Sequence, residues 1–202
     1  MSADIGTGSQ TSAASQIQRP VRMNPHITAA EALAAFQRKI PGATAEVRAV
    51  FHPFWWVPLT VRTRGLLRRD AVGPGQRMDI LVNAVSGRGV IADFIHDGEA
   101  AAPQEWADII GARGEQRHAP SGSEAERTAQ ALARTKVLKT VKLGMGIDIS
   151  GADDRGARKV LKPNWLVTGG NEKYAATILV DGLDASHYIV RVEKLSSSSS
   201  RP

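Results

Sequence analysis

The chain has 202 residues, of which 42% are hydrophobic and 23% charged, so it can hold one globular domain or two small ones. It contains no cysteine, which excludes disulfides, cysteine-ligated zinc and thiol chemistry. Its formal net charge of +6 permits an anionic partner without requiring one. No apolar run approaches the ~20 residues that cross a bilayer, and no secretory signal is evident, so we expect a cytoplasmic protein.

The N-terminal segment, residues 1–22, is rich in small polar side chains and predicts a disordered leader. A helix is predicted next, because Thr28 and Glu31 have the spacing of a capping box and apolar residues follow every three or four positions. Pro41 and Gly42 predict its end.

A strand rich in aromatic residues is predicted at residues 50–60, which hold two of the four tryptophans. Residues 160–168 resemble this stretch, so that Trp165 corresponds to Trp55. We expect both tryptophans to be core residues, each buried beneath the helix that precedes it in the chain.

Prolines interrupt both stretches at corresponding places, Pro53 and Pro163. Proline has no N–H to donate to a sheet, so each predicts an edge or a bulge. Pro58 is five positions after Pro53, and strand residues an odd number of positions apart direct their backbone groups to opposite edges. The N–H that Pro58 lacks would therefore have faced the other edge of the strand. We expect the strand to bulge or change its partner between Pro53 and Pro58.

The remaining elements follow from alternation, turn residues and caps. Strands are predicted at 78–85 and 90–94, joined by a turn at 86–89. A connector with a short helical patch at 104–110 leads to a long helix that begins near Ser121 and reaches about residue 143. The glycines at 144–146 indicate a helix end and a loop. Strands at 160–168, 174–181 and 188–195 complete the chain.

This order predicts an α+β fold of two similar halves, each a helix followed by a three-stranded antiparallel meander. The halves are residues 23–97 and 123–195, joined by the connector at 98–122. The serine-rich tail at 196–202 is expected to be flexible.

The first half resembles the PepSY-type repeat in two segments, 27–33 with the Pro-Gly exit at 41–42, and the closing hairpin at 80–90. Asn83 stands where that family usually has aspartate, whereas Asp181 keeps it in the second half. The resemblance implies a small α+β module that binds or restrains other proteins, often outside the cytoplasm.

The strongest acid–base or metal-like cluster is Asp93, His96 and Asp97. On a strand the two carboxylates share one face while His96 points away, so we interpret the cluster as a solvated strand end. No nucleophile motif or phosphate loop is present. We therefore expect no catalytic residue, metal or cofactor, and an enzyme or a ligand pocket between the halves has the least support.

The second face of the aromatic strand carries Phe54, Trp56 and His52. If this face is open, its aromatic side chains form an apolar patch of the kind that marks interfaces. The alternative is that a helix or the other half covers it. Our main hypothesis is a non-enzymatic protein-binding or assembly module that uses this face or an edge strand, with another protein or with itself.

A basic stretch supports a second hypothesis, a nucleic-acid or other polyanion binder. Lysines recur every third residue on the second predicted helix, and more cations follow it. The alternative is a solvated helix face. The candidate residues are Arg134, Lys136, Lys139, Lys142, Arg158, Lys159 and Lys162.

Overall fold

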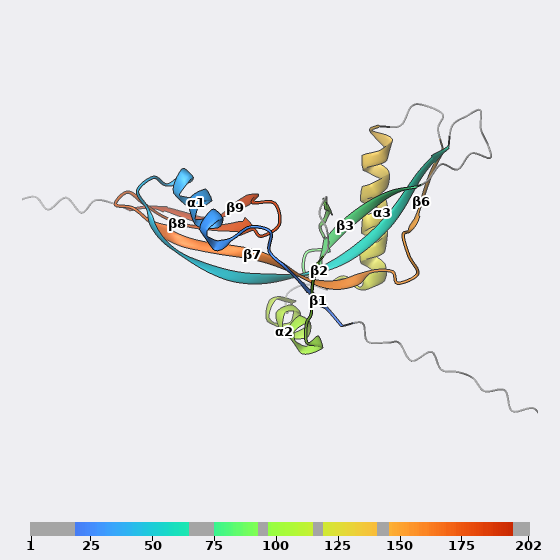
Figure 1. Cartoon of the computed structure of the whole chain (residues 1–202), viewed down its shortest axis with the longest axis horizontal. Helices are drawn as coiled ribbons and strands as arrows, with labels where there is room; N and C mark the ends of the chain where they lie inside the picture. Colours follow the sequence, from blue (N-terminus) through green and yellow to red (C-terminus); the bar gives the residue numbers. More distant parts are fainter. Residues whose placement is uncertain (1–18, 65–74, 93–96, 115–118, 141–145, 196–202) are drawn as a thin grey trace, which may run out of the picture.

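The computed structural model describes residues 19–64, 75–92, 97–114, 119–140 and 146–195 (Figure 1). Its strands are β1 (Val21–Met23), β2 (Thr44–Arg64), β3 (Gln76–Asn83), β4 (Gly89–Ala92), β5 (Gly98–Ala100), β6 (Gly146–Gly151), β7 (Arg158–Gly170), β8 (Tyr174–Asp181) and β9 (His187–Lys194). Its helices are α1 (Ala29–Lys39), α2 (Pro103–Gly114) and α3 (Gly122–Leu138).

One nine-stranded sheet runs through the molecule, and the 21-residue strand β2 is its axis. The first part of β2, up to Trp56, pairs with β7. Its later part pairs with β3 on one edge and with β6 on the other. All pairings are antiparallel except that of β1 with β7.

Two lobes form at opposite ends of β2, as Figure 1 shows. The α1 lobe combines α1 and the first part of β2 with β7, β8 and β9. The α3 lobe combines α3 and β6 with the later part of β2, β3 and β4. Helix α2 lies near the middle. The α1 lobe therefore joins elements from both ends of the chain, whereas the α3 lobe is built from its middle part, between β2 and β6.

The expected fold of two halves, each with its own helix and meander, is wrong, although the α+β class and the antiparallel sheet are present. The reason is length. A strand of 21 residues extends about 70 Å, whereas the 11-residue helix α1 is about 16 Å long. One helix cannot cover such a strand, so α1 covers the first part and α3 the later part. The glycine-rich segment read as a loop also contributes a strand, β6.

The two tryptophans occupy corresponding sites, but not beneath the helices we expected. Trp55 donates its indole N–H to the carbonyl of Pro120 at 2.9 Å, and Trp165 donates to that of Ile27 at 2.7 Å. Each acceptor directly precedes the N-cap residue of a helix. Trp55 thus joins α3, which follows it in the chain, and Trp165 joins α1, which belongs to the other end.

The prolines mark where β2 and β7 change partners. The carbonyls of Pro53 and Pro163 accept hydrogen bonds from Ala84 and Gly182 in the turns after β3 and β8, at 3.0 and 3.1 Å. The carbonyl of Pro58 instead accepts from the segment between β6 and β7. The N–H and C=O of one strand residue point toward the same edge of the strand. Each of these carbonyls faces a turn or connecting segment, so the N–H that proline lacks would also have faced that segment and not a neighbouring strand. The predicted change of partner between Pro53 and Pro58 is confirmed.

Alternation along β2 and β7 separates the two faces of the sheet. Odd-numbered residues pack against the helices, as Trp165 does in the cluster under α1 and Leu59 in the cluster under α3. In the middle, Trp106 of α2 meets Trp55 edge-on, with ring centroids 5.3 Å apart. Even-numbered residues such as Val160 form a cluster on the opposite face, which β1 helps to cover through Met23.

Capping boxes start α1 and α3 as the sequence predicts. In α1 the Thr28 hydroxyl accepts from the Glu31 N–H, and the Glu31 carboxylate accepts from the Thr28 N–H. Hydrogen bonds from the Thr28 backbone and side chain hold the pKa of Glu31 below its usual value.

Thr28→Ala is expected to lower the free energy of unfolding by about 1 kcal/mol, because the first turn of α1 loses its side-chain acceptor. Urea denaturation followed by circular dichroism measures this change. Thr135→Ala on exposed α3 is the matched control, since its hydroxyl only bonds back to the carbonyl of Ala131. If both variants lose the same free energy of unfolding, the N-cap hydrogen bond of Thr28 does not stabilise the protein.

Candidate functional site

A buried polar cluster lies between the two lobes, where β2 and β7 pair and β8 ends. Lys162 and Asp181, which are only 6% and 9% exposed, form an ion pair. The Lys162 ammonium also lies 3.4 Å from Oδ1 of Asn164 and 5.8 Å from the centre of the Phe54 ring. The amide of Asn164 is 2.9 Å from Nδ1 of His52. These groups bond to one another, so the arrangement satisfies its own charges.

A hollow of about 390 Å³ opens above this cluster, between the turn after β3 and the strands β8 and β9. Arg88 and Val90 line one side, and Leu179 and Tyr188 line the other. The only charges within it that are buried, Lys162 and Asp181, neutralise each other. The hollow therefore offers a partly apolar surface rather than a set of convergent catalytic groups.

The turns beside this hollow correspond to each other. Asn83 and Asp181 each accept, through Oδ1, the N–H of the residue two positions on, at 2.9 Å in both cases. Gly87 and Ala185 then adopt positive φ angles of 71° and 61°. Side-chain hydrogen bonds of this kind stabilise turns, which explains the polar residue at both positions.

The predicted partner-binding residues Phe54, Trp56 and His52 share one face of β2, as their spacing indicated. Phe54 and Trp56 are partly buried in a cluster with Met23 of β1 and Leu183 of the β8–β9 turn. A turn of the other half, which was the alternative kept open for this face, and β1, which was not predicted as a strand, therefore cover part of it. The assignment of a partner to these residues stays a prediction.

Trp56 is also held by charged neighbours. Its indole N–H donates to Asp79 at 2.8 Å, and the Arg158 guanidinium lies 4.6 Å from the ring centre. Burial, together with the nearby charge of Arg77, lowers the pKa of Arg158. The hydrogen bond to Asp79 raises the pKa of Arg77. Both arginines are charged at neutral pH, and their contacts on Trp56 are cation–π contacts.

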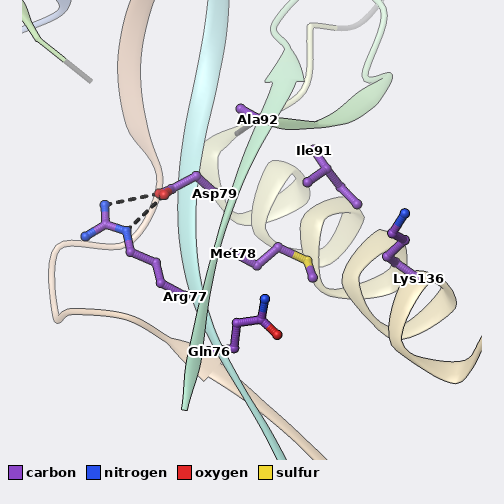
Figure 2. A pocket seen from close by; sticks show the side chains of 7 residues that line it. All are labelled: Gln76, Arg77, Met78, Asp79, Ile91, Ala92 and Lys136. Atoms are coloured by element: carbon purple, nitrogen blue, oxygen red, sulfur yellow. Dashed lines mark hydrogen bonds and ion pairs between the residues drawn. The ribbon is translucent and has the colours of Figure 1, made fainter. Parts of the chain in front are cut away.

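A second hollow of about 400 Å³ lies beside β3, where β4 ends (Figure 2). Arg77 and Asp79 point to one side of β3 and bond to each other, whereas Met78, Ile91 and Lys136 lie on the side of α3. The two cations of this hollow thus lie on opposite faces of the sheet. They do not form a joint anion site.

The predicted polyanion-binding residues are dispersed. Arg134, Lys136 and Lys139 are exposed at the end of α3, which stops at Leu138, and Lys142 lies outside the described residues.

The three cations of β7 are engaged elsewhere. Arg158 pairs with Asp153, Lys162 is buried with Asp181, and Lys159 lies 5.9 Å from the ring centres of Trp55 and Trp106. The structure therefore does not gather the six described residues on one surface, and polyanion binding stays a prediction.

The metal-like cluster of the sequence falls mostly outside the described residues, which omit 93–96. Asp97 is described, and its carboxylate lies 3.6 Å from Nε2 of His26 and 3.4 Å from Nδ2 of Asn24. Among the described ranges no group of three histidine or acidic side chains could hold a metal ion. In the same ranges, no helix combines the length and apolarity needed to cross a membrane.

The largest feature that sequence reasoning missed is the surface of β9. All eight of its residues are exposed. Of the eight large apolar side chains that are exposed in the described part of the chain, six lie on β9 or next to its end: Tyr174, Tyr188, Ile189, Val190, Val192 and Leu195. The sequence predicts a strand at 188–195, but it does not show whether another element covers that strand.

A groove of about 330 Å³ borders β9 on the side of α1. Ala176 and Ile178 of β8, Ile189 and Val192 of β9 and Ile40 after α1 supply most of its apolar lining. It exists because α1 is short and packs on β2, β7 and β8. We call β9 and this groove together the β9 surface.

Comparison of the chain with protein-family models, with curated proteins and with solved structures gives no match. The resemblance to the PepSY-type repeat accordingly stays a prediction.

Proposed function

We propose that this chain is a protein-binding or assembly module that acts through the β9 surface. One observation carries the proposal: β9 is an edge strand whose large apolar side chains are exposed, with Ile189 at 69% and Tyr188 at 62%. Within the described residues β9 pairs with β8 alone, so its outer edge offers a row of backbone donors and acceptors.

Edge strands of stable monomers usually carry features that block pairing, such as proline or charged residues that point inward. Of the features that block edge pairing, β9 has a register shift opposite Thr177 and Ile178 and the exposed Lys194, but it has no proline and no charged residue that points inward. Two of its apolar side chains, Ile189 and Val192, face the groove beside α1. An added strand would gain main-chain hydrogen bonds from the edge and apolar contacts from the groove.

The double variant Ile189→Lys/Val192→Lys is expected to lose capture of a partner from native host extract while it stays folded. Both side chains are more than half exposed, so the change removes surface rather than core. Capture by immobilised protein, with circular dichroism as a check of folding, measures the outcome.

Val90→Lys on β4 and Leu138→Lys on α3 are matched controls, because each removes an exposed apolar side chain elsewhere. If these controls lose the partner as fully as the β9 variant does, or if the β9 variant still binds it, the β9 surface is not the interface.

A further inference from the structure

We infer that the partner of the β9 surface is a second copy of this chain, joined by antiparallel pairing of β9 with β9 around Val192. This inference rests on the proposed function and deepens it by naming the occupant of the edge. The order of charged and apolar side chains along β9 supports this pairing.

In this register Val192 lies opposite Val192 of the second copy. One residue away on either side, Arg191 lies opposite Glu193 of the second copy, and the twofold symmetry creates this pair twice. Opposite charges that face each other across an antiparallel pair are stabilising, and like charges are destabilising. The charge order of β9 is therefore complementary to itself.

Registers shifted by one step are less favourable, because they set like charges against each other. Centring the pair on Arg191 places two arginines opposite each other, and centring it on Glu193 places two glutamates opposite each other. Of these three registers, the one around Val192 alone pairs Arg191 with Glu193.

The two faces of the joined strands also match. Arg191 and Glu193 line the face away from α1, where they already form an ion pair on their own strand. Val192 and Ile189 face the groove beside α1. In the dimer Val192 meets its own copy on this face. The grooves of both chains then become one continuous apolar surface under two α1 helices.

A seam of one strand pair is small, so we expect a dissociation constant of about 1–100 μM. Purified protein should approach twice the 21.6 kDa mass of one chain in light scattering as its concentration rises through this range. A mass of one chain at every concentration overturns the inference.

Single cysteines test the register, since the natural chain has none. Residues directly opposite in an antiparallel pair have Cα atoms about 4.5–5.5 Å apart, within the range of a disulfide. Val192→Cys is therefore expected to form a disulfide-linked dimer on mild oxidation. Val190→Cys would place its two thiols about 14 Å apart along the strands, so it should not. Cross-linking of the Val190 variant instead of the Val192 variant overturns the register.

Charge exchange tests the same pairing without a thiol. Arg191→Glu or Glu193→Arg alone should weaken the dimer about tenfold or more, because each sets like charges against each other twice. The double exchange Arg191→Glu/Glu193→Arg should restore the wild-type dissociation constant. Both residues are more than half exposed, so these changes should not unfold the chain. Failure of the double exchange to restore the dimer overturns the pairing.

The outcome also separates this inference from the proposed function. A monomeric protein whose Ile189→Lys/Val192→Lys variant loses a different protein overturns self-pairing and keeps the β9 surface as an interface. A monomer in which the Val192→Cys thiol resists alkylation indicates that another part of this chain covers β9. That result overturns both.

Discussion

Trp165→Ala is expected to lower the free energy of unfolding by about 3 kcal/mol and to speed amide hydrogen exchange in α1. The indole packs in the cluster beneath α1 and donates its N–H to the carbonyl of Ile27, just before the helix begins. Its loss leaves both a cavity and an acceptor without its donor. Site-resolved hydrogen exchange should show the increase in residues 29–39 while α3 keeps its protection.

Trp55→Ala is the matched variant, because Trp55 makes the corresponding bond to Pro120 before α3. Its effect should fall on residues 122–138 and leave α1 protected. Each tryptophan is therefore expected to protect the helix that comes from the other half of the chain, Trp165 protecting α1 and Trp55 protecting α3. If Trp165→Ala exposes α3 and Trp55→Ala exposes α1, the helices pack in the uncrossed order.

Asp181→Asn is expected to destabilise the protein by about 3–5 kcal/mol, because it leaves the ammonium of Lys162 buried without its counterion. The substitution is well matched to the site. An asparagine can still accept the Leu183 N–H in the turn, as Asn83 does in the corresponding turn after β3. The loss should therefore report the charge rather than the turn, and equilibrium denaturation in urea measures it.

The double variant Asp181→Asn/Lys162→Met should recover most of this loss, since it removes the buried charge that lacks a partner. Glu105→Gln is the control, because it breaks an exposed ion pair in which Nη2 of Arg22 lies 2.5 Å from Oε1 of Glu105. Its cost should stay below about 1 kcal/mol. Asp181→Asn that is no more costly than this control would mean that water reaches Lys162 freely.

The features predicted well from the sequence are those governed by neighbours in the chain. Thr28 and Ser121 start helices because their hydroxyls accept N–H groups three residues on. Pro53 and Pro58 set a change of partner because they lack a donor. The alternation along β2 separates the helix-facing side from the other side because strand side chains alternate.

The candidate site was much less predictable. Lys162 appears in the sequence as one of several cations near the second helix, yet it is buried opposite Asp181, 19 positions away. The sequence predicts a strand at 188–195, but not that Val190 and Val192 on it are exposed. In each case the outcome depends on which element covers the residue, and helix length and strand order decide that.

The sequence by itself determined where helices begin, where strands turn and which side of each strand is apolar, because these properties depend on a few adjacent residues. Only the tertiary structure decided that one long strand serves two lobes, that α1 covers strands near the C-terminal end while α3 covers strands of the first half, and that β9 lies at an edge among the described strands. These outcomes depend on pairings between residues far apart in sequence, such as Trp165 with Ile27, which local patterns do not specify.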